Sequence, residues 1–238
     1  MQERALQTQV AWACRILAMG GHSDLTLGHI SARGPDDWVY IKRKGLGLNE
    51  VTPDDILTID LDRNKLAGTG MVHLEAVLHT EVYRLRPDVK AVAHTHPPYA
   101  TALSASSTEL KFVNHDAVLF RDGVGIFDGT ADLILDTEKG QAVASVLGQR
   151  RAALLSNHGI LAADSSVPWV VYTALTLERA ARIQSIATTF GALQPIPQET
   201  VDHMFAKKYR DEFIEEYWQY LLREVRRQGL AVGMPAAD

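Results

Sequence analysis

The chain has 238 residues, 46% of them hydrophobic and 22% charged, which is enough for one sizeable core and predicts a single domain over residues 1–238. Its net charge of −5 argues against nucleic acid as a partner, and no apolar run reaches the roughly 18 residues that a membrane span needs. A lone cysteine, Cys14, and the lack of a signal-peptide pattern at the start lead us to expect a cytoplasmic protein that binds a small molecule.

The first half of the chain alternates helical and extended patterns. Apolar residues recur on one helical face before Gly20-Gly21, and a Gly-Pro-Asp-Asp turn separates two short extended runs. Pro87 ends a second helical pattern and is followed directly by a strand pattern. The elements expected here are helices at 3–19 and 71–85, a hairpin of 28–33 and 38–41, a helical turn at 52–55, and strands at 56–61 and 89–96.

The second half contains longer helical patterns. We expect helices at 132–147, 168–190 and 198–227, and a strand at 152–155. Strands and helices are mixed along the whole chain, and the early strands are joined by turns too short for parallel crossovers. The sequence therefore predicts an α/β fold in which helices cover a central sheet that is mixed or largely antiparallel.

Three histidines lie where strands are expected to end. His94 and His96 are two residues apart on a strand, so their side chains leave the same face and can share one metal ion. His158 follows another strand, and Gly159 permits close approach of the backbone. An isolated histidine is more often a hydrogen-bonded polar residue than a metal ligand, and the hypothesis of a metal site depends on all three imidazoles meeting.

Three imidazole ligands without a fourth protein ligand are typical of a catalytic metal site. A closed structural zinc site would recruit cysteines, and none is near. Glu75, His79 and Tyr83 are spaced four apart on one expected helix face, and the chain then returns into the strand that carries His94. Glu75 can therefore reach the metal as an acid/base, although most glutamates on helices are simply solvated.

The same residues resemble the class II aldolase/adducin family. The matching segments are Glu75-x3-His79-x3-Tyr83, Arg86-Pro87-Asp88-Val89, Ala93-His94-Thr95-His96-Pro97, Asn157-His158-Gly159, Gly28-His29-Ile30-Ser31 and Val51-Thr52-Pro53-Asp54-Asp55. The resemblance implies that His94, His96 and His158 bind the metal and that Glu75 is the catalytic acid/base. It also implies a three-layer α/β/α sandwich around a mainly antiparallel sheet, and a homotetramer with sites at subunit interfaces.

The chain departs from the sugar-phosphate aldolases of this family in the residues that hold phosphate. His29 stands where those enzymes have an asparagine, Lys44-Gly45 where they have Thr-Gly, and His73-Leu74 where they have Ser-Ser. His115 stands at the position of a substrate-side tyrosine, by an ungapped count from His96. Lys44 and His73 are equally compatible with solvent-exposed roles. The replacements resemble the branch of the family that decarboxylates hydroxylated aromatic or pyridine dicarboxylates.

The leading functional hypothesis is thus decarboxylation of a hydroxylated aromatic or related organic acid in aromatic compound catabolism, with His29, Lys44, Gly45, His73 and His115 binding substrate. Aldol cleavage of a non-phosphorylated hydroxy acid or a sugar phosphate is the alternative that uses the same Glu75. Epimerases of the family carry aspartate there, and a non-catalytic adducin-like interaction domain lacks the histidines. Zinc is the first expectation for the metal, with manganese, cobalt or iron also compatible with three imidazoles.

Overall fold

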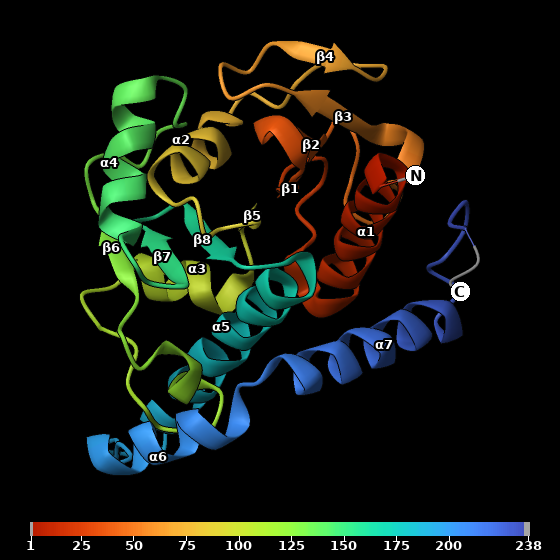
Figure 1. The fold of residues 1–238 in the computed structure, drawn as a ribbon. Helices are drawn as coiled ribbons and strands as arrows, with labels where there is room; N and C mark the ends of the chain where they lie inside the picture. Colours follow the sequence, from red (N-terminus) through yellow and green to blue (C-terminus); the bar gives the residue numbers. More distant parts are fainter. Residues whose placement is uncertain (1, 236–238) are drawn as a thin grey trace.

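The computed structural model describes residues 2–235, which form one mixed sheet with helices on both faces (Figure 1). The helices are α1 (Gln2–Leu17), α2 (Val77–Leu85), α3 (Pro98–Ser104), α4 (Thr137–Leu147), α5 (Val167–Thr188), α6 (Gln198–Lys208) and α7 (Asp211–Arg227). Short helical turns occupy Ala18–His22, Pro35–Asp37, Pro53–Asp55 and Ala117–Phe120. The strands are β1 (His29–Arg33), β2 (Val39–Lys42), β3 (Ile56–Ile59), β4 (Lys65–Ala67), β5 (Ala91–Thr95), β6 (Gly125–Phe127), β7 (Ala152–Leu155) and β8 (Gly159–Asp164).

The sheet has the strand order β4-β3-β2-β1-β5-β8-β7-β6 over the described residues. Every neighbouring pair is antiparallel except β6 and β7, which are parallel. The central strand β5 pairs His94 with His29 of β1 on one side and with Leu161 of β8 on the other. This register brings two of the predicted site residues side by side, although they are far apart in the sequence.

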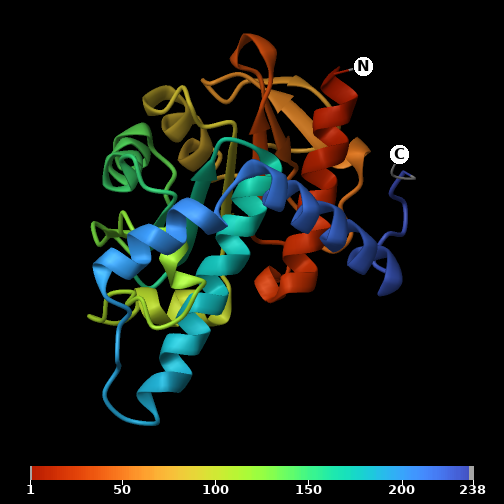
Figure 2. The same cartoon turned by 60° about the horizontal axis from the view of Figure 1, so that its bottom comes forward.

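Each face of the sheet has its own apolar layer. One core joins the sheet to α1, α3, α5 and α7, and the other joins the opposite face to α2 and α4. Figures 1 and 2 show α1 and α5 on one side of the strands and α2 and α4 on the other. The alternation of side chains along β2 explains the division, because Tyr40 packs in the first core while Val39 and Ile41 pack in the second. The expected α/β/α sandwich with a mainly antiparallel sheet is confirmed.

Several expected boundaries were wrong. The helix expected from residue 71 begins at Val77, so Glu75 lies in the turn before it. The helix expected from residue 132 begins at Thr137, and Asp136 is its N-cap, accepting a hydrogen bond from the Lys139 amide. The helix expected over 198–227 breaks at Tyr209–Arg210 into α6 and α7. Strands β4, β6 and β8 were not anticipated. β4 and β6 have only three residues each, too few to show an alternating pattern, and β8 is a nearly continuous apolar run that follows β7 after a short turn.

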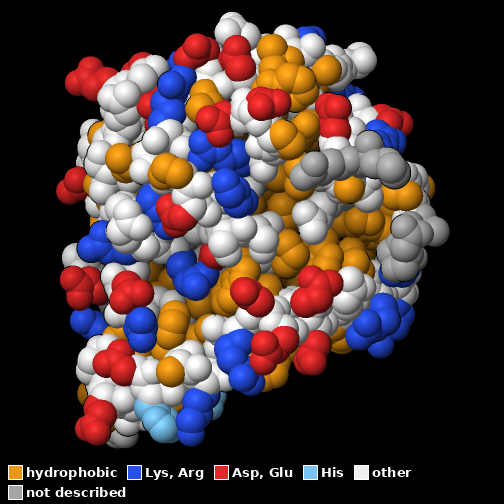
Figure 3. Space-filling view, viewed as in Figure 1, with side chains coloured by type: hydrophobic (Ala, Val, Ile, Leu, Met, Phe, Trp, Pro, Cys, Tyr) orange, Lys and Arg blue, Asp and Glu red, His pale blue; other side chains and the backbone are white. Residues whose placement is uncertain are grey.

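No helix within residues 2–235 is long and apolar enough to cross a membrane. On the face drawn in Figure 3, lysine and arginine side chains are interspersed with aspartate and glutamate. Apolar side chains gather on the same face near α1 and α7.

Candidate metal centre

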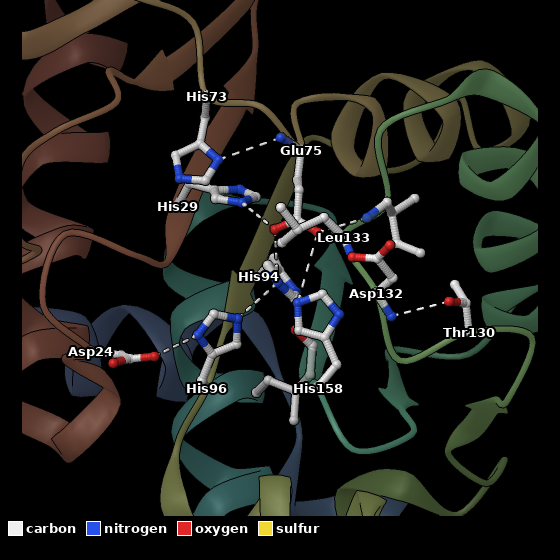
Figure 4. Close-up of polar contacts among 12 residues, drawn as sticks. Asp24, His29, His73, Glu75, His94, His96, Thr130, Asp132, Leu133 and His158 are labelled. Carbon is white, nitrogen blue, oxygen red and sulfur yellow. Dashed lines mark hydrogen bonds and ion pairs between the residues drawn. The ribbon is translucent and has the colours of Figure 1, made fainter.

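The three predicted histidines meet at one end of the central strands. His94 is in β5, His96 follows it directly, and His158 lies in the turn between β7 and β8. One ring nitrogen of each lies within 4.8 Å of the others, and Figure 4 shows the three rings converging. Asn157 turns the chain with a φ of 58°, and a Cβ on Gly159 would lie 2.6 Å from the Thr95 carbonyl oxygen. The close backbone approach expected at Gly159 is therefore present, and it brings His158 beside the β5 histidines.

The hydrogen bonds around two of these rings leave lone pairs facing each other. His94 Nδ1 donates to the Ile160 carbonyl at 2.9 Å, and His96 Nδ1 lies 2.9 Å from the Asp24 carboxylate. In the tautomers that these contacts favour, the proton is on Nδ1 and Nε2 is an acceptor, and the two Nε2 atoms lie 3.1 Å apart. Two nitrogens bound to one tetrahedral zinc lie about 3.3 Å apart, given Zn–N bonds of about 2.0–2.1 Å. The donor set therefore fits a divalent cation, with Asp24 and the Ile160 carbonyl orienting the rings.

Glu75 lies against this set of nitrogens. Its Oε2 is 3.7 Å from His94 Nε2, and its Oε1 is 3.7 Å from His158 Nε2. Oε1 also accepts a hydrogen bond of 2.9 Å from the Ile134 amide, in the loop that precedes α4. The side chain is 4% exposed, and burial raises the pKa of the Glu75 carboxyl above its usual value. A carboxyl group held here could carry a proton close to a bound substrate.

Two of the predicted substrate-binding residues lie on the other side of Glu75. His29 Nε2 is 3.9 Å from Glu75 Oε2, and the His29 and His73 rings have centroids 3.9 Å apart (Figure 4). The Glu75 amide is 3.5 Å from His73 Nδ1. His29 is fully buried and His73 is 7% exposed. His29, His73 and Glu75 thus form a second group of potential metal ligands next to the first.

The other three predicted substrate-binding residues are Lys44, Gly45 and His115. Lys44 is partly buried and its amide donates to the Met71 carbonyl at 2.9 Å, while Gly45 is exposed. His115 is exposed, and its carbonyl accepts a 2.8 Å hydrogen bond from the Tyr209 hydroxyl of the turn after α6. Within residues 2–235, none of the three lines the cavity described next. Their role in substrate binding stays a prediction.

A cavity of about 590 Å³ opens beside the histidines. It is lined by Ser23, Asp24, Leu27, Gly28, His73, Glu75, His96, Pro98, Thr101, Ala131, Asp132, Leu133, Asn157 and His158. Asp24, Thr101 and Asp132 could not be selected from the sequence, because each belongs to a segment without a recognisable motif. Only the fold brings these segments to the metal centre.

Lys42 is another residue that the sequence did not single out. It is fully buried at the end of β2, and its Nζ donates to the Thr26 carbonyl at 3.0 Å. Burial lowers the pKa of this ammonium group. The contact ties β2 to the loop that carries Asp24, and so holds the carboxylate that orients His96.

Comparisons with known proteins identify the family. The chain matches the Class II Aldolase and Adducin N-terminal domain over residues 8–185, and it belongs to this family. It is 33% identical to a 3,4-dihydroxyphthalate decarboxylase of Rhodococcus jostii over 195 residues, which cover 76% of this chain and 80% of that protein. It is 27% identical to a 5-deoxy-D-ribulose 1-phosphate aldolase of Bacillus thuringiensis over 171 residues, covering 72% and 79%. A crystal structure of an aldolase II superfamily protein from Pseudomonas syringae superimposes with a TM-score of 0.86 at 28% identity, covering 96% of this chain and 95% of that one.

Proposed function

We propose that the chain is a divalent-metal-dependent carbon–carbon lyase that decarboxylates a hydroxylated aromatic or related organic acid or diacid. The observation that carries the proposal is the pair of imidazoles of His29 and His73, buried beside Glu75 and next to the three-histidine set. Imidazole N–H groups suit the oxygens of a carboxylate or phenol held against a flat ring. Similarity to a decarboxylase of a dihydroxylated aromatic diacid supports the same substrate class.

In this proposal His94, His96 and His158 hold the cation, with zinc as the first candidate and manganese or cobalt as alternatives. The cation would supply Lewis-acid withdrawal of electron density from the substrate's oxygens. His29 and His73 orient the substrate from the opposite side of Glu75. Leu27, Pro98 and Leu133 line the cavity and would contact the apolar face of a bound aromatic ring.

Glu75 handles the proton in this mechanism. As the carbon–carboxylate bond breaks, carbon dioxide leaves and its bonding electron pair stays on the substrate carbon. The carboxyl group of Glu75 donates its proton to that carbon and is reprotonated from solvent. In the net reaction a hydrogen atom replaces the carboxylate group, and carbon dioxide is released. General-acid catalysis of this kind typically contributes about 10²–10⁴-fold. The buried environment of Glu75 favours the protonated form that this step needs.

The test uses purified protein reconstituted separately with zinc, manganese and cobalt. It is incubated with a panel of ortho-hydroxylated aromatic mono- and dicarboxylic acids, while carbon dioxide and the decarboxylated product are measured. We expect turnover of at least one diacid, and a fall in kcat of about 10²–10⁴-fold in Glu75→Gln. Glu138→Gln, on the exposed first turn of α4, is the matched control. Absence of carbon dioxide across the whole panel with all three metals would contradict the proposal.

Aldol cleavage is the second candidate, because the same nitrogens and Glu75 can serve proton transfer next to a carbonyl, and an aldolase is among the similar proteins. In that reaction Glu75 would move the proton between a substrate carbon and a hydroxyl oxygen. An aldehyde product formed from a hydroxy acid or sugar phosphate, without carbon dioxide, would favour this candidate.

We also propose one domain over residues 1–238, a cytoplasmic location, and a homotetramer with sites at subunit interfaces. Apolar residues of α7 pack in the same core as those of α1 and α5, which supports one domain. Leu25, Met71 and Leu74 are 86%, 67% and 51% exposed close to the cavity-lining segments, and a neighbouring subunit would cover them. Light scattering after size-exclusion chromatography measures the assembly, and a monomer would contradict it.

A further inference from the structure

A continuous line of buried hydrogen bonds leads from α2 through β1 to the metal centre. The Tyr83 hydroxyl and Ser31 Oγ lie 2.7 Å apart, Ser31 Oγ and His79 Nδ1 lie 2.7 Å apart, and His79 Nε2 and His29 Nδ1 lie 2.6 Å apart. All four side chains are fully buried. The line ends at His29 Nε2, which finds no hydrogen-bond partner within residues 2–235 and lies 3.9 Å from Glu75 Oε2.

The direction of these hydrogen bonds follows from the one proton that a phenol carries. Within residues 2–235, Ser31 Oγ is the hydrogen-bond acceptor next to the Tyr83 hydroxyl, so Tyr83 donates to Ser31. Ser31 then donates its own proton to His79 Nδ1. The reverse direction would leave the Tyr83 proton buried without an acceptor, which is costly. Burial raises the pKa of the Tyr83 phenol, so the hydroxyl keeps this proton at pH 7.

The tautomers of the two histidines follow in turn. Burial lowers the pKa of His79 to about 3, so its ring is neutral at pH 7 and carries one proton. Because His79 Nδ1 accepts from Ser31, the proton is on Nε2 and is donated to His29 Nδ1. His29 Nδ1 is then an acceptor, and the His29 proton is on Nε2, pointing toward Glu75. Nδ1 of the neighbouring His73 accepts a hydrogen bond from the Glu75 amide, so the His73 proton is on Nε2 as well.

We propose that Tyr83, Ser31 and His79 are positioning residues that hold His29 as an Nε2–H donor for an anionic oxygen of the substrate. The group formed by His29, His73 and Glu75 is therefore a subsite for a carboxylate or phenolate oxygen and not a second metal site, although its geometry alone would allow a cation. The proposal rests on the proposed function only for the identity of that oxygen. The tautomers themselves are a property of the resting protein.

The first experiment measures the tautomers directly. Long-range ¹H–¹⁵N correlation spectra of ¹⁵N-labelled protein at pH 7 are recorded before and after one and two equivalents of zinc, with signals assigned from single histidine substitutions. We expect His29 and His79 to carry their protons on Nε2 in both states, and zinc to bind with one tight equivalent per chain. A bare or zinc-bound Nε2 at His29 overturns the proposal, as does a second tight equivalent that is lost in His29→Asn.

The second experiment breaks the line far from the metal. Tyr83→Phe and Ser31→Ala should each produce a population of His29 with its proton on Nδ1, and the affinity of the zinc-loaded protein for the probe salicylate should fall about tenfold, as expected for one hydrogen bond. Ser31→Thr, which keeps the hydroxyl, should restore the Nε2–H tautomer of His29 and the affinity for salicylate. Tyr40→Phe and Ser104→Ala are matched controls, because both residues are buried outside the line.

The outcomes separate this proposal from the proposed function. Unchanged His29 tautomers in both Tyr83→Phe and Ser31→Ala overturn the positioning role, whatever reaction the protein catalyses. Failure to release carbon dioxide overturns the decarboxylase proposal and leaves the tautomer result standing. If Tyr83→Phe does not fold, Ser31→Ala with its threonine rescue decides the question alone.

Discussion

The contact between Asp24 and His96 gives a quantitative prediction for metal binding. The Asp24 carboxylate lies 2.9 Å from His96 Nδ1, holds that proton and so directs the Nε2 lone pair at the cation. Loss of a carboxylate that orients a ligating histidine typically weakens metal binding by about 10–100-fold. The Asp24 side chain is 40% exposed and that of His96 is 13% exposed, so water screens part of the charge. We therefore expect Asp24→Asn to weaken zinc binding about tenfold, the lower end of that range, which corresponds to about 1.4 kcal/mol of binding free energy.

The assay is a zinc competition titration against a chromophoric chelator at pH 7 and fixed ionic strength. Asp24→Ala, which removes the acceptor as well as the charge, should weaken zinc binding more than Asp24→Asn does. Asp54→Asn is the matched control, because Asp54 is 82% exposed and pairs with Arg4 on the surface. An orienting role for Asp24 is contradicted if both Asp24 variants bind zinc within twofold of the unaltered protein while His96→Ala does not.

Two further predictions concern the glycine and a buried histidine near the site. In Gly159→Ala the new Cβ would lie 2.6 Å from the Thr95 carbonyl oxygen and 2.6 Å from His96 Cδ2. We therefore expect the free energy of unfolding, measured in urea, to fall by about 1–3 kcal/mol and zinc binding to weaken. Unaltered values for both would contradict the close approach. Burial lowers the pKa of His22 from 6.5 to about 3. Between these two pH values the unfolded chain binds a proton at His22 that the folded chain does not, so the free energy of unfolding falls as the pH drops from 6.5 toward 3. The free energy of unfolding of His22→Asn, measured by urea denaturation, should depend less on pH between pH 4 and 6, by up to about 1.4 kcal/mol per pH unit. An unchanged pH dependence would count against a buried neutral ring.

Much of the metal centre could be predicted from local sequence, because its geometry depends on short-range periodicity. Residues two apart on a strand leave the same face, which places His94 beside His96 in any sheet that contains β5. The spacing of four between His79 and Tyr83 likewise places both on one side of α2, where they contact the same serine. Glu75 was expected on that helix and instead lies in the turn before it, yet it still reaches the imidazoles.

The surroundings of the metal centre depend on strand pairing and loop packing between segments that are distant in the sequence. The antiparallel register of β1 with β5 sets His29 beside His94, and the loop before α4 places the Ile134 amide on Glu75 across 59 residues of sequence. Ser31 lies 48 residues from His79, so its place between His79 and Tyr83 depends on the pairing of distant segments and could not be predicted from local sequence. The sequence by itself predicted which groups would bind a metal and which would carry a proton. Only the tertiary structure decided which side chain contacts His29 Nδ1 and which oxygens contact Nδ1 of His94 and His96, because these are long-range contacts that local periodicity does not encode.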